Sequence, residues 1–370
     1  MRLTSLDVFR GIAIAGMILV NKAGVADQVY PFLEHAKWHG CTPTDLVFPF
    51  FLFIVGVAMI FSLSKYNEGN RPTAAVYRRI FRRVAILFAL GLLLNGFWTY
   101  NWDTIRIMGV LQRISLAYLF AALIVINVPR KGQWAIALLL LIGYWVAMSF
   151  IPVPGYGAGN LSSPEGNFAS YIDRLIIGTK HLHPGDAFKT MGDPEGLFST
   201  LPAIVTVLIG YFTGDWLRLQ PVQRRTSIGL VLFGIGCLGV GWAWGLVFPI
   251  NKRLWTSSYV LFSSGWALLL LAACYELIEV RNRRWGKPFE VMGLNAIFVF
   301  VASVLLIKIL VKTKIGTGEN APSTYTWIYE HLFLPWASPM NASLVFAVLT
   351  LLFWWAICYA MYRQRWFVKI

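Results

Sequence analysis

The sequence predicts an all-α polytopic membrane protein with about ten transmembrane helices. Hydrophobic residues make up 57% of its 370 residues and charged residues only 13%, which is about half the charged share of a typical soluble domain. Apolar stretches of about 18 residues or more recur along the whole length, and each is long enough to cross the hydrocarbon core of a bilayer as a helix. Because no clear internal repeat divides the chain, we expect residues 1–370 to form a single transmembrane domain.

The predicted spans alternate with polar connections from one end of the chain to the other. They cover residues 6–23, 43–64, 76–97, 107–127, 133–151, 196–216, 226–248, 255–279, 289–311 and 341–362. The first span lacks the features of a cleavable signal peptide, because no small-residue cleavage site follows it before more apolar sequence begins. We therefore expect it to remain in the protein as a transmembrane helix.

Basic residues are concentrated in connections that fall on one side of the membrane. The largest groups are Arg78, Arg79, Arg82 and Arg83; Arg218, Arg224 and Arg225; and Arg281, Arg283, Arg284 and Lys287. The positive-inside rule assigns this side, together with both chain termini, to the cytoplasm. Topology thus accounts for the net charge of +15, and we expect a lipid bilayer rather than nucleic acid as the partner.

The cysteines and histidines do not form a recognisable metal or disulfide pattern. Cys237, Cys274 and Cys358 lie inside apolar spans and only Cys41 lies in a connection, which favours neither a disulfide framework nor a metal cluster. The sequence also lacks a Gly-rich phosphate loop and an HExxH motif. The pair His181 and His183 supplies too few ligands for a metal site, so we expect no metal cofactor.

Two long polar connections are predicted on the non-cytoplasmic side, at residues 152–195 and 312–340. Connections of this length usually have a role of their own or are disordered. The first ends in the turn-forming string Gly-Asp-Pro-Glu-Gly, which carries Asp193 and Glu195 directly before a span. Because the connection after the first span faces the same side, we expect this acidic pair to share a membrane face with the residues that follow Asn21.

A polar cluster lies where the first predicted span ends and the second begins. It comprises Asn21, His35, Trp38, His39 and Asp45, and polar groups at membrane depth are costly enough to be functional candidates. The imidazole of His35 is suited to proton transfer near neutral pH, and the amide of Asn21 could donate to an oxyanion. Asp45 could orient an imidazole or bind an ammonium group, and Trp38 offers a flat apolar face for a sugar ring. The alternative is that His35 is a solvated loop residue without a catalytic role.

Charged groups toward the cytoplasmic side are candidates for binding a phosphate-bearing donor. Asp7 and Arg10 lie one helical turn apart, which is also typical of a simple ion pair at a helix start. Arg113 lies within the fourth span without an acidic neighbour in sequence, and a buried guanidinium usually holds a carboxylate or a phosphate. The arginines of residues 78–83 are explained either by topology and anionic lipid headgroups or by a phosphate-bearing cytosolic donor.

Several strings in the chain resemble one family of membrane acetyltransferases. They are SLDVFRGIAIAGMILVN (Ser5 to Asn21), HAKWHGCTPTDLVFPFFLFIVG (His35 to Gly56), RIMGVLQRISLAY (Arg106 to Tyr118), GDPEGLFSTLPAI (Gly192 to Ile204) and NKRLWTSSYVL (Asn251 to Leu261). These strings are similar to those of the heparan-α-glucosaminide N-acetyltransferase family and its bacterial relatives. Lysosomal members carry an additional N-terminal luminal region, so we expect this chain to correspond to the membrane catalytic core. The opening string is also similar to ten-span acyltransferases that modify surface polysaccharides, but those typically place a histidine where this chain has Asn21.

The resemblance implies transfer of an acetyl group from cytosolic acetyl-CoA to the amine of a glucosamine residue across the membrane. It places the essential histidine on His35, the essential asparagine on Asn21 and the aspartate of the DLVFP string on Asp45. The residues expected to bind the acceptor sugar are Trp38, His39, Asp193, Glu195 and Asn251. Lysosomal members commonly have asparagine at the position of His39, so whether His35, His39 or both act as the base stays open.

The resemblance further implies a bacterial inner-membrane location and a homodimer. The CoA nucleotide is expected near the cytoplasm, with donor-binding residues Asp7, Arg10, Arg78, Arg79, Arg82 and Arg113. Direct transfer with His35 as general base and a covalent acetyl-histidine intermediate are both compatible with these residues. Other functions also remain open, namely a secondary transporter of amino sugars or an O-acyltransferase of surface polysaccharide.

Overall fold

The computed structural model describes residues 3–21, 28–67, 72–185, 188–318 and 321–368, and residues 22–23 of the first predicted span lie outside these ranges. Within them the chain folds into α-helices joined by loops and short 3₁₀ or π turns, with isolated β-bridges in place of extended strands. The α-helices are α1 (Thr4–Asn21), α2 (Val47–Asn67), α3 (Ala74–Gly96), α4 (Val110–Asn127), α5 (Arg130–Phe150), α6 (Phe168–Ile176), α7 (Thr200–Leu219), α8 (Arg224–Gly245), α9 (Ser257–Tyr275), α10 (Lys287–Gly293), α11 (Ala296–Lys312), α12 (Thr324–Leu332) and α13 (Pro339–Arg363). The predicted all-α class is confirmed.

Helices long and apolar enough to cross a membrane occur along the whole of the described chain. Eight satisfy this description, namely α1, α2, α4, α5, α7, α8, α9 and α13. A ninth is obtained if α10 and α11, which meet at a bend of 75°, together form one broken span. The remaining predicted span is the 23-residue helix α3, which carries Arg79, Arg82 and Arg83 in any stretch long enough to cross. The protein is therefore a multi-pass membrane protein.

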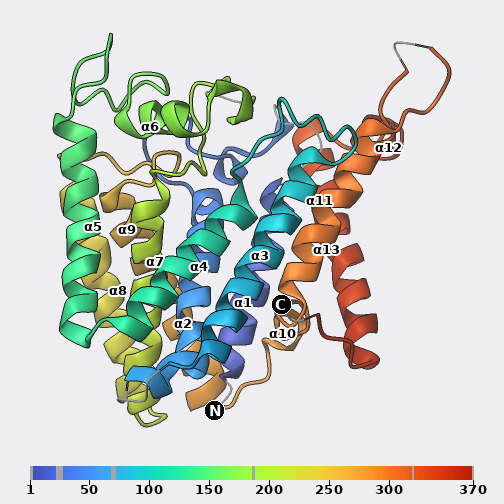
Figure 1. Cartoon of the computed structure of the whole chain (residues 1–370). Helices are drawn as coiled ribbons and strands as arrows, with labels where there is room; N and C mark the ends of the chain where they lie inside the picture. Colours follow the sequence, from blue (N-terminus) through green and yellow to red (C-terminus); the bar gives the residue numbers. More distant parts are fainter. Residues whose placement is uncertain (1–2, 22–27, 68–71, 186–187, 319–320, 369–370) are drawn as a thin grey trace.

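The helices stand side by side and place the long loops at one end of the bundle (Figure 1). The short helices α6 and α12, which lie in the two long polar connections, are both at this end. The first residues of α1 and the helix α10 are at the opposite end. We call these the loop end and the basic end, because Arg10 and the arginines of α3 lie toward the second.

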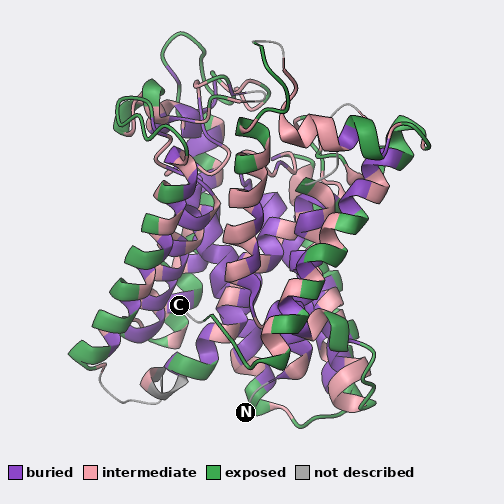
Figure 2. Ribbon diagram, turned by 90° about the vertical axis from the view of Figure 1, so that its right-hand side faces the viewer, coloured by how far each residue is buried: buried purple, intermediate pink, exposed green. Residues whose placement is uncertain are grey.

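Buried residues fill the middle of the bundle, and exposed residues face outward (Figure 2). On the peripheral helices α5 and α8 many exposed side chains are large and apolar, among them Leu138, Leu139, Leu232 and Ile235. A soluble protein rarely exposes so continuous an apolar surface. These faces are suited to contact lipid.

Glycines bring the central helices unusually close together. A Cβ atom on Gly11 of α1 would lie 1.8 Å from the carbonyl oxygen of Phe289, directly against α10. A Cβ atom on Gly56 of α2 would lie 1.9 Å from the carbonyl oxygen of Val207 on α7. Small residues permit such backbone approach between membrane helices. The position of α1, which carries Asp7, Arg10 and Asn21, is thereby fixed against α10, and that of α2, which directly follows the loop with Asp45, is fixed against α7.

Candidate active site

The segment before α2 folds around the carboxylate of Asp45. This carboxylate is almost completely buried and accepts hydrogen bonds from the backbone N–H groups of Ala36 and Thr42, each at 3.0 Å, and from the Thr42 hydroxyl at 3.1 Å. Thr42 and Asp45 form a capping box at the start of the short helix η3 (Pro43–Leu46). The carboxylate also contacts His35, whose Nδ1 lies 2.7 Å from Asp45 Oδ1. Asp45 thus fixes both the loop and the imidazole.

A lysine from a distant part of the chain completes this cluster. Lys252 lies in the connection between α8 and α9, and its Nζ is 3.5 Å from Asp45 Oδ1 and 3.1 Å from His35 Nδ1. Burial lowers the pKa of Lys252, whereas the negative charges of Asp45 and Glu195 oppose that change. The structure therefore brings an imidazole, a carboxylate and an amine together at the loop end.

Two connections far apart in sequence are joined beside this cluster. The N–H of Gly40 donates to the carbonyl oxygen of Ile250 at 2.7 Å, and its positive φ of 105° is one that glycine adopts readily. The buried Asn251 donates from Nδ2 to Nδ1 of His39 at 3.3 Å and accepts at Oδ1 from the N–H of Leu254 at 3.0 Å. Asn251 therefore holds the joint between the connections.

The two candidate bases occupy different surroundings. His35 lines a cavity inside the bundle, whereas His39 is outside the set of described residues that line this cavity. Besides its contact with Asn251, His39 lies with Nε2 at 3.5 Å from the hydroxyl of Ser162. Partial burial lowers the pKa of His39. The geometry therefore favours His35 as the imidazole that meets a ligand in the cavity.

Trp38 packs into the loops that cover this end of the bundle. Its indole Nε1 donates to the carbonyl oxygen of Leu161 at 2.7 Å, and its ring centroid lies 5.6 Å from that of Phe188. Neither Trp38 nor Asn251 belongs to the described lining of the cavity. The structure thus places these two predicted acceptor residues beside the cavity, in positions that support its loops.

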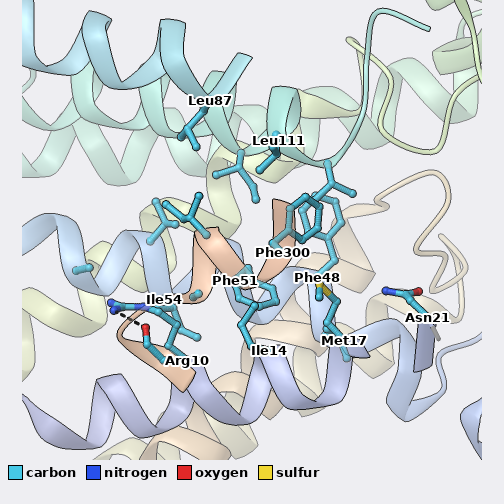
Figure 3. Close-up of a pocket in the computed structure, with 18 of the residues that line it drawn as sticks. Arg10, Ile14, Met17, Asn21, Phe48, Phe51, Ile54, Leu87, Leu111 and Phe300 are labelled. Atoms are coloured by element: carbon cyan, nitrogen blue, oxygen red, sulfur yellow. Dashed lines mark hydrogen bonds between the residues drawn. The ribbon is translucent and has the colours of Figure 1, made fainter. Parts of the chain in front are cut away.

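The cavity has a volume of about 710 Å³, within the range of small-molecule binding sites. Its lining includes Asp7 and Asn21, which lie near opposite ends of α1 and thus about 21 Å apart along the helix axis at 1.5 Å per residue. Figure 3 shows Arg10 and Asn21 at its two ends, with apolar side chains between them. The apolar part includes Ile14, Phe51, Ile54, Leu87, Leu111 and Phe300. The cavity therefore connects a charged end to the polar cluster through an apolar passage.

At the basic end the lining contains an ion pair and a further arginine. Arg10 lies 3.2 Å from Asp7, and Arg83 lies with its guanidinium carbon 4.6 Å above the ring of Tyr118. The buried Nε of Arg83 makes no hydrogen bond within the described part of the chain. By contrast, the three donor-binding residues predicted on α3, Arg78, Arg79 and Arg82, are exposed and outside the described lining, and Arg83 was not among the predicted donor-binding residues. The sequence identified this group of arginines but not the member that faces the cavity.

The two acids of the segment before α7 occupy different positions. The guanidinium of Arg106 donates to both carboxylate oxygens of Asp193 and also to Glu195. Burial opposes the charge of Arg106, but the two carboxylates outweigh it and raise its pKa. Burial likewise opposes the charge of Glu195, but Arg106 and Arg113 outweigh it and lower the pKa of that carboxyl. Asp193 is buried in this pairing, whereas Glu195 lines the cavity.

Arg113 is completely buried behind the cavity lining. It donates to the carbonyl oxygen of Gly196 at 3.1 Å and to the hydroxyl of Ser199, and its guanidinium carbon lies 5.0 Å above the ring of Trp255. These hydrogen-bond partners are backbone and hydroxyl groups at the start of α7 rather than the carboxylate or phosphate that the sequence suggests. Arg113 thus supports the segment that carries Glu195.

Fold and site together define a class of protein. It is an all-helical membrane protein whose cavity has a His–Asp pair at one end and arginines at the other. The family described as heparan-α-glucosaminide N-acetyltransferase, catalytic, matches residues 2–236. The human heparan-α-glucosaminide N-acetyltransferase is 29% identical over an alignment of 426 residues that covers 100% of this chain and 60% of the human protein. The mouse protein of that name is 30% identical over 356 residues, 82% of this chain and 54% of the mouse protein. This chain belongs to the heparan-α-glucosaminide N-acetyltransferase family, and it spans little more than half the length of these relatives.

Proposed function

We propose that the protein transfers the acetyl group of acetyl-CoA to the amine of glucosamine or of a glucosamine-containing sugar. The observation that carries this proposal is the cavity, which joins a basic end to the His35–Asp45 pair through an apolar passage. The names of the two relatives support the same reaction class. Basic residues are concentrated at the end of the bundle opposite the loops, which favours a cytoplasmic location for that end. In a bacterial inner membrane, acetyl-CoA then enters from the cytosol and the sugar enters from the periplasm.

The donor lies along the length of the cavity in this proposal. Guanidinium groups bind phosphates through charge-assisted hydrogen bonds, and Arg83 and Arg10 line the basic end. The pantetheine arm occupies the apolar passage beside Ile14 and Phe51. The thioester then reaches His35 at the loop end without either large substrate crossing the membrane.

The acceptor enters at the loop end. Its ammonium group is attracted by the carboxylate of Glu195, which lines the cavity, and it releases one proton to water before attack, because only the free amine has a lone pair for the thioester carbon. His35 acts as general base through Nε2, while Asp45 holds Nδ1–H. The amide of Asn21, which also lines the cavity, donates to the oxyanion of the tetrahedral intermediate.

The chemical step forms a C–N bond and breaks the C–S bond of the thioester. The proton taken from the attacking nitrogen by His35 is returned to the thiolate of CoA, so the products are an acetamide and CoA thiol. A two-step variant would first form acetyl-His35 and release CoA before the sugar binds. Incubation with acetyl-CoA alone separates the two: direct transfer predicts no release of CoA in the first turnover, and a trapped acetyl-histidine would contradict it.

The function itself is tested with purified protein in detergent. We expect release of CoA thiol only when acetyl-CoA and an amino sugar are both present, with N-acetylglucosamine identified by mass spectrometry when glucosamine is the acceptor. CoA should also raise the unfolding temperature, because a ligand that binds the folded state stabilises it. A transporter of amino sugars would bind glucosamine without responding to CoA, and that result would contradict the proposal. The homodimer remains a prediction from family resemblance.

A further inference from the structure

Lys252 reaches the His35–Asp45 pair from a distance of 217 residues in sequence. Its Nζ lies 3.1 Å from His35 Nδ1 and 3.5 Å from Asp45 Oδ1, and both Lys252 and His35 line the cavity. The Nδ1 atom cannot donate to Asp45 and accept from Lys252 at the same time. Since Asp45 lies closer, at 2.7 Å, the arrangement fits a carboxylate that accepts from both the imidazole and the ammonium group.

This arrangement changes the charge that the imidazole experiences. A carboxylate beside an imidazole favours the doubly protonated, positively charged ring, which cannot act as a base. An ammonium group at 3.1 Å opposes that second proton by like-charge repulsion and balances the charge of Asp45. The ring then keeps one proton, on Nδ1, and the lone pair of Nε2 is available.

The charged groups around the His35–Asp45 pair come from three segments of the chain. Asp45 belongs to η3, Lys252 and Arg253 to the connection between α8 and α9, and Glu195 to the segment before α7. Arg106 pairs with Glu195. Lys252 is thus the cation in direct contact with the His35–Asp45 pair among the described residues.

The backbone around Lys252 is held in place. Its carbonyl oxygen accepts from the N–H of Trp255 at 3.1 Å, and the preceding residue, Asn251, is buried and joined to His39 and Leu254. Through the bond between Gly40 and Ile250, this connection is tied to the loop that carries His35. The backbone that carries Lys252 is therefore held in place relative to the loop that carries His35.

We propose that Lys252 is a positioning residue that keeps His35 neutral, with its proton on Nδ1, so that Nε2 acts as the base of the proposed transferase reaction. The inference rests on the proposed function for its role in turnover. The effect of the Lys252 charge on the protonation of His35 does not depend on any reaction.

The first test is the pH dependence of kcat/KM in the variants Lys252→Met and Lys252→Arg. Without the ammonium group the charge of Asp45 is no longer balanced, so we expect the acidic limb of the Met variant to move to higher pH by about one unit. At pH values well below the midpoint of this limb, activity then falls about 10-fold, since one unit changes the ratio of neutral to protonated imidazole tenfold, and most of it returns well above the midpoint. Arginine stays charged, so its profile should match the wild type. An equal loss at every pH in the Met variant would overturn the proposal.

The second test does not depend on activity. Titration of ¹⁵N-labelled histidines by NMR, with the His35 signals assigned through His35→Ala, should show the second proton binding His35 at higher pH in Lys252→Met than in wild type. Unchanged titration would overturn the inference, whereas a wild-type protein without transferase activity would overturn only the proposed function. If the Met variant does not fold, Lys252→Gln, which keeps a hydrogen-bond donor without the charge, gives the same comparison.

Discussion

His35 and Asp45 are ten residues apart in sequence, and their Nδ1 and Oδ1 atoms are 2.7 Å apart in the structure. The carboxylate is buried and accepts from the backbone of the same loop, whereas the imidazole faces the cavity. A carboxylate in this position fixes the tautomer and the orientation of the ring. The pair is therefore arranged to present Nε2 of His35 to a ligand.

The two histidines of the loop should differ in their importance. Replacement of His35 by alanine removes the general base and should lower kcat by about 10²–10⁴-fold. Replacement of His39 by alanine should change kcat only a few-fold, because that ring contacts Asn251 and Ser162 rather than the cavity. Turnover of acetyl-CoA with glucosamine measures both. A larger loss in His39→Ala, at equal thermal stability, would reverse the assignment.

Asp45→Asn tests the orientation of the imidazole. Asparagine keeps the size of the side chain but can present an N–H group to Nδ1, which would favour the opposite tautomer of His35. By analogy with other His–Asp pairs we expect a fall in kcat of about 10²–10⁴-fold. The KM for acetyl-CoA should change little, because Asp45 does not belong to the described cavity lining. An Asn variant with normal kcat would show that the carboxylate has no role in catalysis.

Arg83 and Arg82 provide a matched pair for the donor site. Both lie on α3, but only Arg83 lines the cavity, whereas Arg82 is exposed. If Arg83 binds a phosphate of CoA, Arg83→Gln should weaken CoA binding about 10-fold, which corresponds to about 1.4 kcal/mol. Arg82→Gln should leave the Kd within about twofold. Isothermal titration of the purified variants with CoA measures this, and equal effects would place the nucleotide elsewhere.

The buried carboxyl group of Asp173 should make the stability of the folded protein depend on pH. Burial raises the pKa of this carboxyl to about 7, although it accepts a hydrogen bond from the N–H of Phe198. The unfolded group has a pKa of about 3.9, so the folded state binds more protons between these two values and its stability falls as pH rises from about 4 to about 7. Asp173→Asn keeps the acceptor and removes the charge.

The Asn variant should therefore gain more stability over wild type at pH 8 than at pH 5. We expect a difference in unfolding temperature on the order of a few degrees, measured by thermal unfolding in detergent at both pH values. A pH-independent difference would show that Asp173 is ionised in the folded protein throughout this range.

Much of the fold could be predicted from the sequence because apolar stretches of sufficient length have few alternatives to helices in a membrane. A helix or a broken helix pair lies at each of the ten predicted segments. The bend between α10 and α11 was not predicted. It occurs at Asn295, whose buried side chain donates to the carbonyl oxygen of Trp366 and accepts from the N–H of Val368. Such a bend depends on contacts between segments far apart in sequence, which hydropathy does not report.

Contacts between site residues were predictable from spacing only where the residues are close in sequence. His35 and Asp45 lie in one loop, whereas Lys252 and Arg106 meet their partners across 87 residues or more, and no local pattern indicates those contacts. Arg83 is a different case. It lies four residues before Leu87, on the same face of α3, and both line the cavity. The helical phase of α3 could therefore have distinguished it from its neighbours.

The most direct measurement of the central claim uses sealed vesicles containing the oriented protein. Acetyl-CoA labelled in its acetyl group is enclosed on the side of the basic end, and glucosamine is supplied only on the side of the loop end. The account predicts labelled N-acetylglucosamine outside, an equal amount of CoA thiol inside, and neither product with His35→Ala. Labelled product on the side of the basic end, or full activity in His35→Ala, would contradict it.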